Sequence, residues 1–531
     1  TPTEQVLAEL WQEILGLDTV GVHDDFFAIG GHSLLATQVL SRIRRRLNVN
    51  LPLRTLFERG TLEQLAEAVD QQRDAQTEAD DNSEIALAPR NQPLPLSYSQ
   101  QRLWFLDRFE GPSAAYNMTT AIRLRGALDV AALQAALQAV FERHESLRTA
   151  FHLHGDQPCQ VISPAPRVDL TPTELSHLDH EEQAQTLQRL IDEQAARPFD
   201  LQQAPMLRAS LLRLGADDHV LQLVLHHIAT DAWSMGILMQ ELIVGYQART
   251  SGSTPVLPVL PIQFADYAYW QRSETQQRLL ARAIDYWRRQ LDGAPTLVPL
   301  PLDQPRPARP DYQGAALEQR FTPAQAQVLK AYAQQQRATL FMVLLNAFNS
   351  LLQRATGTND FIVGTDLANR EHPALEHLIG FFVNVLPIRA RLSEGESFDA
   401  RLQRLREDCL SAFQHQQVPF DKLVEELQPP RTPGVNPLVQ VLFVMQNTPS
   451  GNASLPELEV EHLVSRQESS KFDLAVFVEE DEDQGLNVRW VYRTSVLHEP
   501  TIQRLEQGFE SLLEQIVSPP GQALDNWSWG L

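Results

Sequence analysis

A polar, acidic stretch divides this 531-residue chain into a short first part and a long second part. The stretch runs from Arg73 to Gln92 and reads RDAQTEADDNSEIALAPRNQ. It has few large apolar side chains and no regular apolar period, so it cannot bury enough surface to form a core. The chain is also longer than one domain usually is. We therefore predict a linker over residues 73–92, after a first unit of residues 1–72.

The first unit has the pattern of a small helical bundle. A helix is predicted to begin at Thr1 and Pro2, because a hydroxyl cap and an early proline favour a helix start, and to end near Gly16. A second helix is predicted from the apolar positions of residues 33–47, and a third begins after Thr61. Three short helices enclose only a small core, so we expect this unit to be all-α.

The second unit mixes helical and strand patterns. Apolar residues three or four apart predict helices near residues 97–109, 129–144, 177–195, 232–248, 274–291, 323–335, 339–354, 398–414 and 499–517. Alternating and β-branched runs predict strands near residues 117–124, 148–153, 208–214, 219–227, 314–321, 360–366, 382–390, 439–446, 472–480 and 486–493. This mixture predicts an α/β or α+β fold, with two halves that meet near residue 265.

Charge and composition narrow the classes of partner. The chain has 44 Lys and Arg against 67 Asp and Glu, a net charge of −23, which disfavours binding to nucleic acid or to an anionic membrane. Its apolar runs are too short to span a bilayer, and its N-terminus lacks the pattern of a signal peptide. Cys159 and Cys409 are too few for a disulfide framework, so we expect a cytoplasmic location. Because the chain begins without Met at a helix start, we expect it to be a piece of a longer protein.

Two adjacent histidines lie where a predicted strand gives way to a predicted helix, in LVLHHIATDAWS. His226 and His227 end the strand, and Asp231 stands at the start of the helix, where it would be a suitable N-cap. Neighbours in a strand point to opposite faces, so one histidine can be packed inside while the other faces an opening and exchanges protons. The alternative is a pair of hydrogen-bonded structural histidines. A metal site is less favoured, because no zinc-motif spacing is present.

A second candidate position is the serine in GGHSLLATQVL. Gly30 and Gly31 predict a turn, and Ser33 follows at the start of a helix. One interpretation is that Ser33 caps the helix. The other is that Ser33 is a covalent attachment point, because a helix N-terminus favours a phosphate-bearing group through its dipole and free amides.

The stretch DDFFAIGGHSL, set within three predicted helices, resembles the thiolation domain, or peptidyl carrier protein, of nonribosomal peptide synthetases. The resemblance covers residues 1–72. It implies a small all-α carrier bundle in which Ser33 carries 4′-phosphopantetheine, transferred from coenzyme A by a separate phosphopantetheinyl transferase. The thiol of that arm would hold a growing chain as a thioester.

The stretch HHIATDA is similar to the HHxxxDG signature of condensation domains, which share the chloramphenicol acetyltransferase-like fold. Other stretches are similar to signatures of this family and occur in the same order: residues 96–118, 143–151, 363–389, 415–427, 436–447 and 491–497. The resemblance spans residues 93–515. It implies an α/β domain of two lobes, residues 93–265 and 266–531, the second ending in the start of a connector, LDNWSWGL.

The resemblance also implies roles for single residues. His227 would face the channel where donor and acceptor meet, His226 would be packed in the interior, and Asp231 would pair with Arg370. Asn436 matches a position that shapes the surroundings of the active site. The implied reaction transfers an acyl group from a donor thioester to an acceptor amine, with no acyl-enzyme intermediate and no metal.

The chain departs from the signature at Ala232, where the family has glycine. Alanine adds one methyl group and is tolerated at a helix start unless the backbone needs a positive φ. We therefore expect activity to be retained.

The sequence also bears on the donor and the partners. SQQRLWFLDRFE and HHIATDAWSMGIL resemble the class that joins two L-configured residues, and His32 stands where carriers that feed epimerases tend to have Asp. A carrier placed before a condensation domain resembles the donor arrangement. The implied partners are an upstream adenylation domain that loads the carrier and a downstream aminoacyl carrier that brings the acceptor.

Two alternatives within the same fold stay open. One is an epimerisation domain, which also follows a carrier; SYSQQRLWFL and HLIGFFVNVLP speak against it. The other is a condensation-like domain that only recruits partner enzymes; the intact His226, His227 and Asp231 speak against that.

Overall fold

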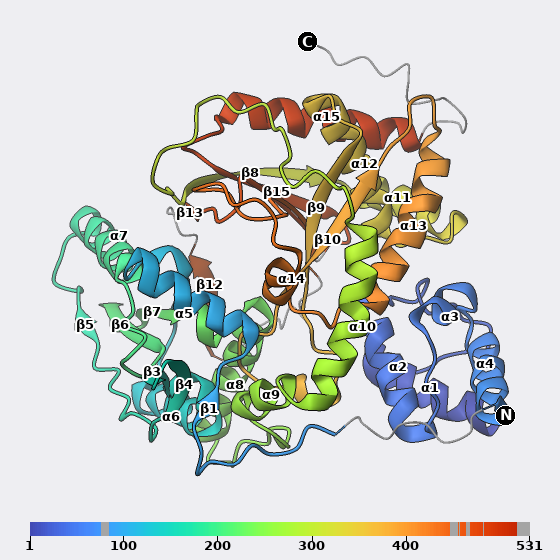
Figure 1. The fold of residues 1–531 in the computed structure, drawn as a ribbon. Helices are drawn as coiled ribbons and strands as arrows, with labels where there is room; N and C mark the ends of the chain where they lie inside the picture. Colours follow the sequence, from blue (N-terminus) through green and yellow to red (C-terminus); the bar gives the residue numbers. More distant parts are fainter. Residues whose placement is uncertain (76–83, 447–454, 456, 464–467, 482, 518–531) are drawn as a thin grey trace.

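The N-terminal helices form a small bundle beside a larger, two-lobed body (Figure 1). The computed structural model describes residues 1–75, 84–446, 455, 457–463, 468–481 and 483–517. Residues 1–75 form four helices: α1 (Pro2–Leu15), α2 (Ser33–Leu47), α3 (Leu53–Glu58) and α4 (Leu62–Ala75). The prediction of three helices misses α3, because six residues are too few to show a helical period.

The start and end predicted for α1 are both confirmed. Thr1 and Glu4 form a capping box, in which each side chain accepts from the backbone nitrogen of the other residue. The helix ends at Gly16, whose φ of 65° is left-handed. Between these ends α1 buries Trp11, which packs edge-on against Phe26 with ring centroids 5.2 Å apart. This aromatic pair lies at the centre of the bundle core.

Two glycines shape the turn that leads into α2. Gly30 has a φ of 113°, which glycine adopts readily. The amide of Gly31 donates to the carbonyl of Phe26 at 2.9 Å. A Cβ at Gly31 would lie 2.4 Å from the Phe26 ring and 2.5 Å from its carbonyl oxygen, so only glycine fits. The turn thereby presses on the bundle core and fixes where α2 begins, at Ser33.

The first lobe is built on a five-stranded sheet in the order β12-β2-β7-β6-β5. Its strands are β2 (Asn117–Arg125), β5 (Thr173–Glu174), β6 (Leu207–Gly215), β7 (Asp218–His226) and β12 (Glu459–Leu463). The central strands β2 and β7 are antiparallel, with Asn117 opposite His226. The first histidine is therefore the last residue of a central strand.

Helices cover both faces of this sheet. The apolar side chains of Leu221, Leu223 and Leu225 pack with α6 (Val130–Arg143) and α8 (Ala232–Thr250). Val220 on the other face packs with α7 (His180–Ala196). A smaller three-stranded sheet and a helix complete the lobe: β1 (Leu94–Pro95), β3 (Thr149–His154), β4 (Gln157–Ile162) and α5 (Tyr98–Glu110).

Two helices lead from the first lobe to the second, α9 (Phe264–Gln271) and α10 (Glu274–Gln290). The second lobe has a seven-stranded sheet in the order β10-β9-β11-β14-β15-β8-β13. Its strands are β8 (Gln313–Phe321), β9 (Asp360–Leu367), β10 (Asn384–Arg391), β11 (Val441–Gln446), β13 (Glu468–Ser469), β14 (Leu474–Glu480) and β15 (Leu486–Arg493). Its helices are α11 (Pro323–Gln335), α12 (Leu340–Thr356), α13 (Phe398–Gln414), α14 (Phe420–Leu427) and α15 (Glu499–Val517). α12 is buried along most of its length, as its apolar sequence predicts.

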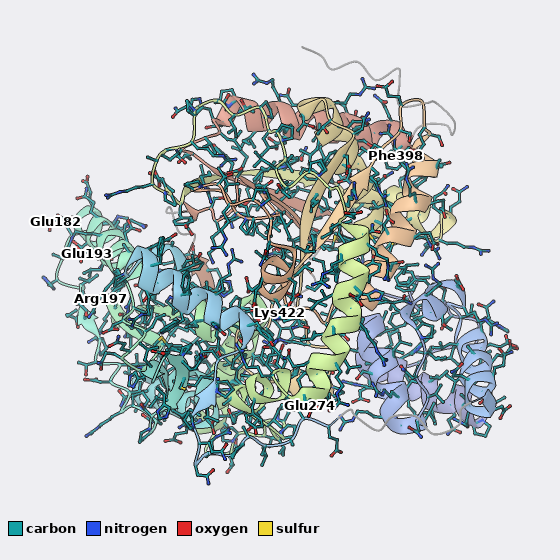
Figure 2. All side chains as sticks on the ribbon, viewed as in Figure 1. Glu182, Glu193, Arg197, Glu274, Phe398 and Lys422 are labelled. Atoms are coloured by element: carbon teal, nitrogen blue, oxygen red, sulfur yellow. The ribbon has the colours of Figure 1, made fainter. Side chains whose placement is uncertain are left out.

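Besides the chain crossing, β12 and α14 connect the lobes. β12 comes from the second half of the sequence but pairs with β2 of the first lobe, with Val460 opposite Leu124. α14 lies against α5 and α10, in the region where Figure 2 labels Lys422. There Arg102 of α5 donates to Asp421 of α14 at 2.9 Å. The two lobes are thus one framework.

The predicted α/β two-lobed fold after a helical bundle is confirmed, and the nine helices predicted in the second unit are all present within a few residues of their expected bounds. The prediction misses short or weakly patterned elements: β1, β4, β5, β12, β13, α9 and α14. Among the described residues, no helix has the length and apolar character that crossing a membrane requires.

The close contact of Gly31 generates a prediction about stability. Gly31→Ala should lower the free energy of unfolding of the bundle by about 1–3 kcal/mol, because Phe26 and its carbonyl must shift. Differential scanning calorimetry of the full chain would measure this as an earlier transition of the N-terminal bundle. Gly21→Ala is the matched control: its nearest neighbour would be 3.4 Å away, so its transition should stay close to that of the unsubstituted chain.

Candidate active site

The two histidines and Asp231 lie on the loop that joins β7 to α8. β7 ends at His226, a single 3₁₀ turn spans His227–Ala229, and α8 begins at Ala232. The strand-to-helix transition predicted here is confirmed, but the prediction that His227 lies in the strand is wrong, because the chain already turns there. Ala232 does not have a positive φ, so the alanine that departs from the family signature introduces no backbone strain.

His226 is buried among aromatic rings. Its Nδ1 accepts a hydrogen bond from the backbone amide of Ile228 at 2.9 Å, and its ring stacks on Tyr116 at 6.4 Å between centroids. Phe199 meets it edge-on at 6.0 Å. Burial lowers the pKa of His226 to about 3. The imidazole is therefore neutral near pH 7 and is held from several sides.

His227 differs from its neighbour in being partly exposed. Its Nδ1 lies 2.7 Å from the carbonyl oxygen of Thr230. A carbonyl can only accept, so Nδ1 carries the hydrogen and Nε2 of the neutral ring keeps its lone pair. Removal from water, and next the positive charge of Lys471, lower the pKa of His227 to about 4, while Thr230 and Asp231 oppose the shift. The site therefore holds a neutral imidazole with a free acceptor nitrogen.

Asp231 is buried and accepts hydrogen bonds from three backbone amides. Its Oδ1 caps α8 through the amide of Ser234 at 2.9 Å. Its Oδ2 accepts from the amides of Phe382 at 2.9 Å and Val383 at 3.1 Å, just before β10. Arg370 donates to Oδ1 at 3.2 Å, so the pair that the sequence resemblance implies is present. The carboxylate joins the histidine loop to the second lobe.

Arg370 is fully buried and grips a turn of the second lobe. One guanidinium nitrogen donates to the carbonyl oxygens of Leu375 at 2.7 Å and Leu378 at 2.6 Å. The other donates to the hydroxyl of Ser234 at 2.6 Å. That hydroxyl in turn donates to the carbonyl of Gly380 at 2.9 Å. Ser234 is a site residue that the sequence did not single out, because its role depends on residues more than a hundred positions away.

Asn436 forms a hydrogen bond to the backbone of Lys471. Its amide nitrogen donates to the Lys471 carbonyl at 2.6 Å, and Arg493 donates to the same oxygen at 2.5 Å. The Lys471 ammonium lies 4.5 Å above the ring of Tyr116, the ring that stacks on His226. Asn436 therefore fixes the backbone position from which a charged side chain reaches the histidines.

Lys471 and Asp366 were not predicted as site residues. Burial lowers the pKa of Lys471 to about 7, against the opposing effect of Asp366. Burial likewise raises the pKa of Asp366 to about 7, against Lys471. One signal was available: Lys471 is one of three lysines in the chain, and the only one next to a predicted buried strand rather than on a helix.

Ser33 is the first residue of α2, and the interpretation of it as N-cap is wrong. The N-cap is His32, whose side chain makes no capping hydrogen bond. Ser33 is partly exposed, and none of the described residues makes a hydrogen bond to its hydroxyl. The partly buried His32 ring beside it has its pKa lowered to about 4 by loss of contact with water, and its Nδ1 has no hydrogen-bond partner among the described residues. A hydroxyl free at a helix N-terminus suits the attachment of a phosphate-bearing group.

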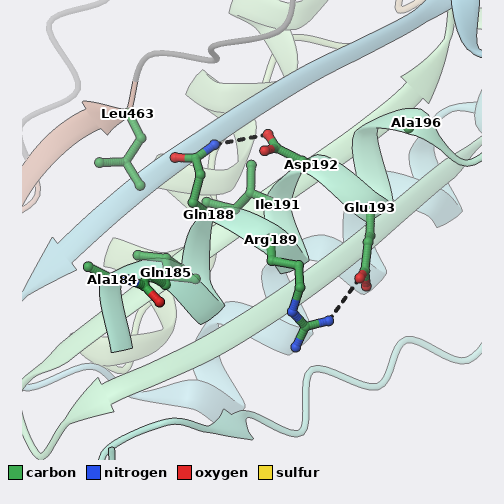
Figure 3. A pocket seen from close by; sticks show the side chains of 10 residues that line it. Ala184, Gln185, Gln188, Arg189, Ile191, Asp192, Glu193, Ala196 and Leu463 are labelled. Carbon is green, nitrogen blue, oxygen red and sulfur yellow. Dashed lines mark hydrogen bonds and ion pairs between the residues drawn. The ribbon is translucent and has the colours of Figure 1, made fainter. Parts of the chain in front are cut away.

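A hollow on the surface of the first lobe lies away from these groups (Figure 3). It is lined by α7 residues together with Leu463 of β12. Its charged groups pair among themselves, as Arg189 does with Glu193 at 2.8 Å, and Gln188 donates to Asp192 at 2.9 Å. We assign it no part in the chemistry. Within the described part of the chain, no three His, Cys, Asp or Glu side chains gather as a metal site would require.

Comparison with known proteins accounts for both units. Residues 90–529 match the family described as condensation domain, and residues 5–69 match the phosphopantetheine attachment site family. One subunit of linear gramicidin synthase from Brevibacillus parabrevis is 42% identical over 528 residues, which are 99% of this chain and 10% of that protein. Another subunit of the same synthase is 40% identical over 98% of this chain and 7% of its own length. The chain thus spans a tenth or less of the length of these relatives.

Solved structures show the same fold. The X-domain in its complex with OxyB from teicoplanin biosynthesis has a TM-score of 0.77 and 30% identity, covering 86% of this chain and 100% of that one. The first condensation domain of the calcium-dependent antibiotic synthetase has a TM-score of 0.67 and 21% identity, covering 82% of this chain and 99% of that one. The chain therefore belongs to the condensation domain family, preceded by a phosphopantetheine-bearing carrier domain, and is a carrier–condensation segment of a nonribosomal peptide synthetase.

Proposed function

We propose that this condensation domain catalyses amide bond formation, with His227 at the reacting atoms. The donor is an acyl group held as a thioester on Ser33 of the carrier, and the acceptor is the amine of an aminoacyl group on a downstream carrier. The observation that carries the proposal is the Nε2 of His227, a neutral acceptor on a partly exposed ring whose other nitrogen is tied to Thr230.

The residues at the start of α2 fit a 4′-phosphopantetheine arm. The partly exposed Ser33 hydroxyl can carry its phosphodiester, next to the first amides of α2. When attached, the group supplies the thiol that holds the donor and the length to reach another domain. The carrier's own part is to present Ser33 at a fixed place, through Gly30, Gly31 and the bundle core.

The bonds that form and break in this reaction require only a weak proton acceptor, which His227 can be. The amine nitrogen attacks the thioester carbonyl, a C–N bond forms, the C–S bond breaks, and the nitrogen must lose one proton. An α-amine has a pKa near about 8, so a useful fraction is neutral without a strong base. Nε2 of His227 can accept a hydrogen bond from the amine, orient it, take its proton as the new bond forms, and pass that proton to the thiolate that leaves on the carrier's arm. A pKa of about 4 keeps the imidazole neutral and able to accept a hydrogen bond near pH 7, and it makes the imidazole a weak base that takes the proton only late, as the C–N bond forms.

Asp231 and Arg370 have positioning roles in this proposal. All the hydrogen bonds described for the Asp231 carboxylate run to the backbone of α8, to the segment before β10 and to Arg370. They hold the loop on which His227 lies. The same holds for Asn436, which acts through the backbone of Lys471.

The finer assignment follows the sequence resemblance. We propose an L-configured donor and an L-configured acceptor, loading of Ser33 by an upstream adenylation domain, and its modification by a phosphopantetheinyl transferase. His32, which stands directly before Ser33, supports the L donor.

A second candidate function is recruitment of a partner enzyme without catalysis. The similarity to an X-domain solved in complex with OxyB favours it. Epimerisation of the donor, the other alternative, would leave the acyl group on Ser33. The three functions predict different products, so one assay separates them.

That assay loads Ser33 with an aminoacyl-phosphopantetheine and follows transfer to a downstream aminoacyl carrier by intact-protein mass spectrometry. We expect transfer in the unsubstituted chain, and a rate about a hundredfold lower for His227→Ala, because a positioned proton acceptor is lost. His23→Ala, on the exposed surface of the carrier, is the matched control and should transfer normally. No transfer with several acceptors would favour recruitment, and inversion of the donor without transfer would favour epimerisation.

The charge of Lys471 generates a prediction about the pKa of His227. Lys471→Met removes a nearby positive charge that opposes protonation of the imidazole, so the pKa of His227 should rise from about 4 toward its ordinary value. Below pH 7 the lysine is charged and Asp366 is largely protonated, so the effect is present where His227 titrates. NMR titration of ¹³C-labelled histidine would measure it. Lys471→Arg keeps the charge and should keep the low pKa; an equal rise in both variants would contradict the electrostatic cause.

A further inference from the structure

Two arginines of the carrier form ion pairs with the condensation domain. Arg42 of α2 forms a two-pronged contact with Glu376, at 3.0 and 2.9 Å from one guanidinium nitrogen to the two carboxylate oxygens. Arg54 of α3 pairs with Glu407 of α13. Arg42 also lies 3.2 Å from Glu13 of α1, which holds its side chain against the bundle.

The Arg42–Glu376 contact is largely withdrawn from water. The side chains of Arg42 and Glu376 are only 19% and 13% exposed, whereas those of Arg54 and Glu407 are 33% and 48% exposed. A charge-assisted hydrogen bond with little solvent around it is stronger than an exposed one, because water and salt screen it less. Among the described residues, Arg42 is the one that pairs with the Glu376 carboxylate.

Glu376 belongs to the turn that the histidine loop grips. Its backbone carbonyl accepts a hydrogen bond from the indole of Trp233, two residues after Asp231, at 3.0 Å. The carbonyls of Leu375 and Leu378, on either side of Glu376, are the two that Arg370 binds. Glu376, which meets the carrier, therefore lies between two carbonyls that hold Arg370, the charged partner of Asp231.

We propose that Glu376 couples carrier docking to the histidine loop: the contact with Arg42 steadies the turn at residues 373–378, and Arg370 and Trp233 pass this restraint to the segment that carries His227. The coupling itself does not depend on the proposed function. Only its benefit, a His227 loop held in place while the donor is bound, rests on that function. The loop is then held most firmly when a carrier, and with it the donor, is in place.

The same contact orients the attachment site. Arg42 and Ser33 lie on one helix, nine residues apart, a rise of about 13 Å along the axis. Because α2 is rigid, fixing Arg42 on Glu376 limits where Ser33 can point. One ion pair thus acts on both the donor and the loop.

The test uses the full chain and hydrogen–deuterium exchange at the loop, a readout independent of transfer. Arg42→Glu should speed exchange by about tenfold at the amides of Phe382 and Val383, which donate to Asp231. Glu376→Arg should do the same. The double variant Arg42→Glu/Glu376→Arg restores an ion pair across the contact and should recover slow exchange.

The control is Arg46→Glu, on the same helix. Arg46 pairs with Glu9 inside the carrier at 3.2 Å, so its reversal changes the carrier's charge without breaking the Glu376 contact, and exchange at the loop should stay slow. In Arg42→Glu, faster exchange at the carrier's contact surface would show that the carrier has detached. If the amides of Phe382 and Val383 still exchanged slowly in that variant, the coupling would be overturned. Exchange that stays fast in the double variant would overturn it as well. If the unsubstituted chain transferred no acyl group, the proposed function would be overturned. The exchange rates would still test the coupling, because they do not depend on transfer.

Discussion

The rest of the site depends on the hydrogen bonds and the ion pair made by the Asp231 carboxylate. It is buried, caps α8, accepts two amides from the segment before β10 and pairs with Arg370. An unpaired charge in such a place is strongly destabilising, and removing one partner of a buried pair costs about 3–5 kcal/mol. The two lobes can therefore approach in few ways other than the one that completes this network. The position of His227 between them follows from satisfying a buried charge.

The two adjacent histidines show how one environment gives two different side chains. Both are kept neutral by burial, with pKa values of about 3 and 4. His226, at the end of β7, accepts from a backbone amide and is enclosed by aromatic rings. His227, in the following 3₁₀ turn, donates to a carbonyl and keeps its other nitrogen free. The end of β7 at His226 and the 3₁₀ turn that begins at His227 give the two rings different surroundings, and the backbone partner of each ring selects its tautomer.

Elements with a long, regular period could be predicted from the sequence, because local pattern alone decides them. α12 and β7 are examples: each is a run rich in apolar residues that the fold buries almost completely. β12 could not be predicted, since it exists only where residue 460 meets residue 124 of another lobe. The same division applies to the site. The loop with both histidines and Asp231 is continuous in sequence, whereas Lys471 and Ser234 gain their roles from contacts made after folding.

A carrier that delivers a donor must bind the condensation domain firmly during the reaction and dissociate from it afterwards. A wholly buried ion pair would be slow to separate, while a fully exposed one contributes little and orients nothing. The pair of Arg42 and Glu376, at 19% and 13% exposure, lies between these limits, and Arg54 and Glu407 add a weaker contact at the edge. Water and salt can reach such a contact, so it can open in each cycle. Glu376 lies on the turn that Arg370 binds, so opening the Arg42–Glu376 contact also weakens the restraint on the histidine loop. Release of the carrier is thereby coupled to a change at the active site.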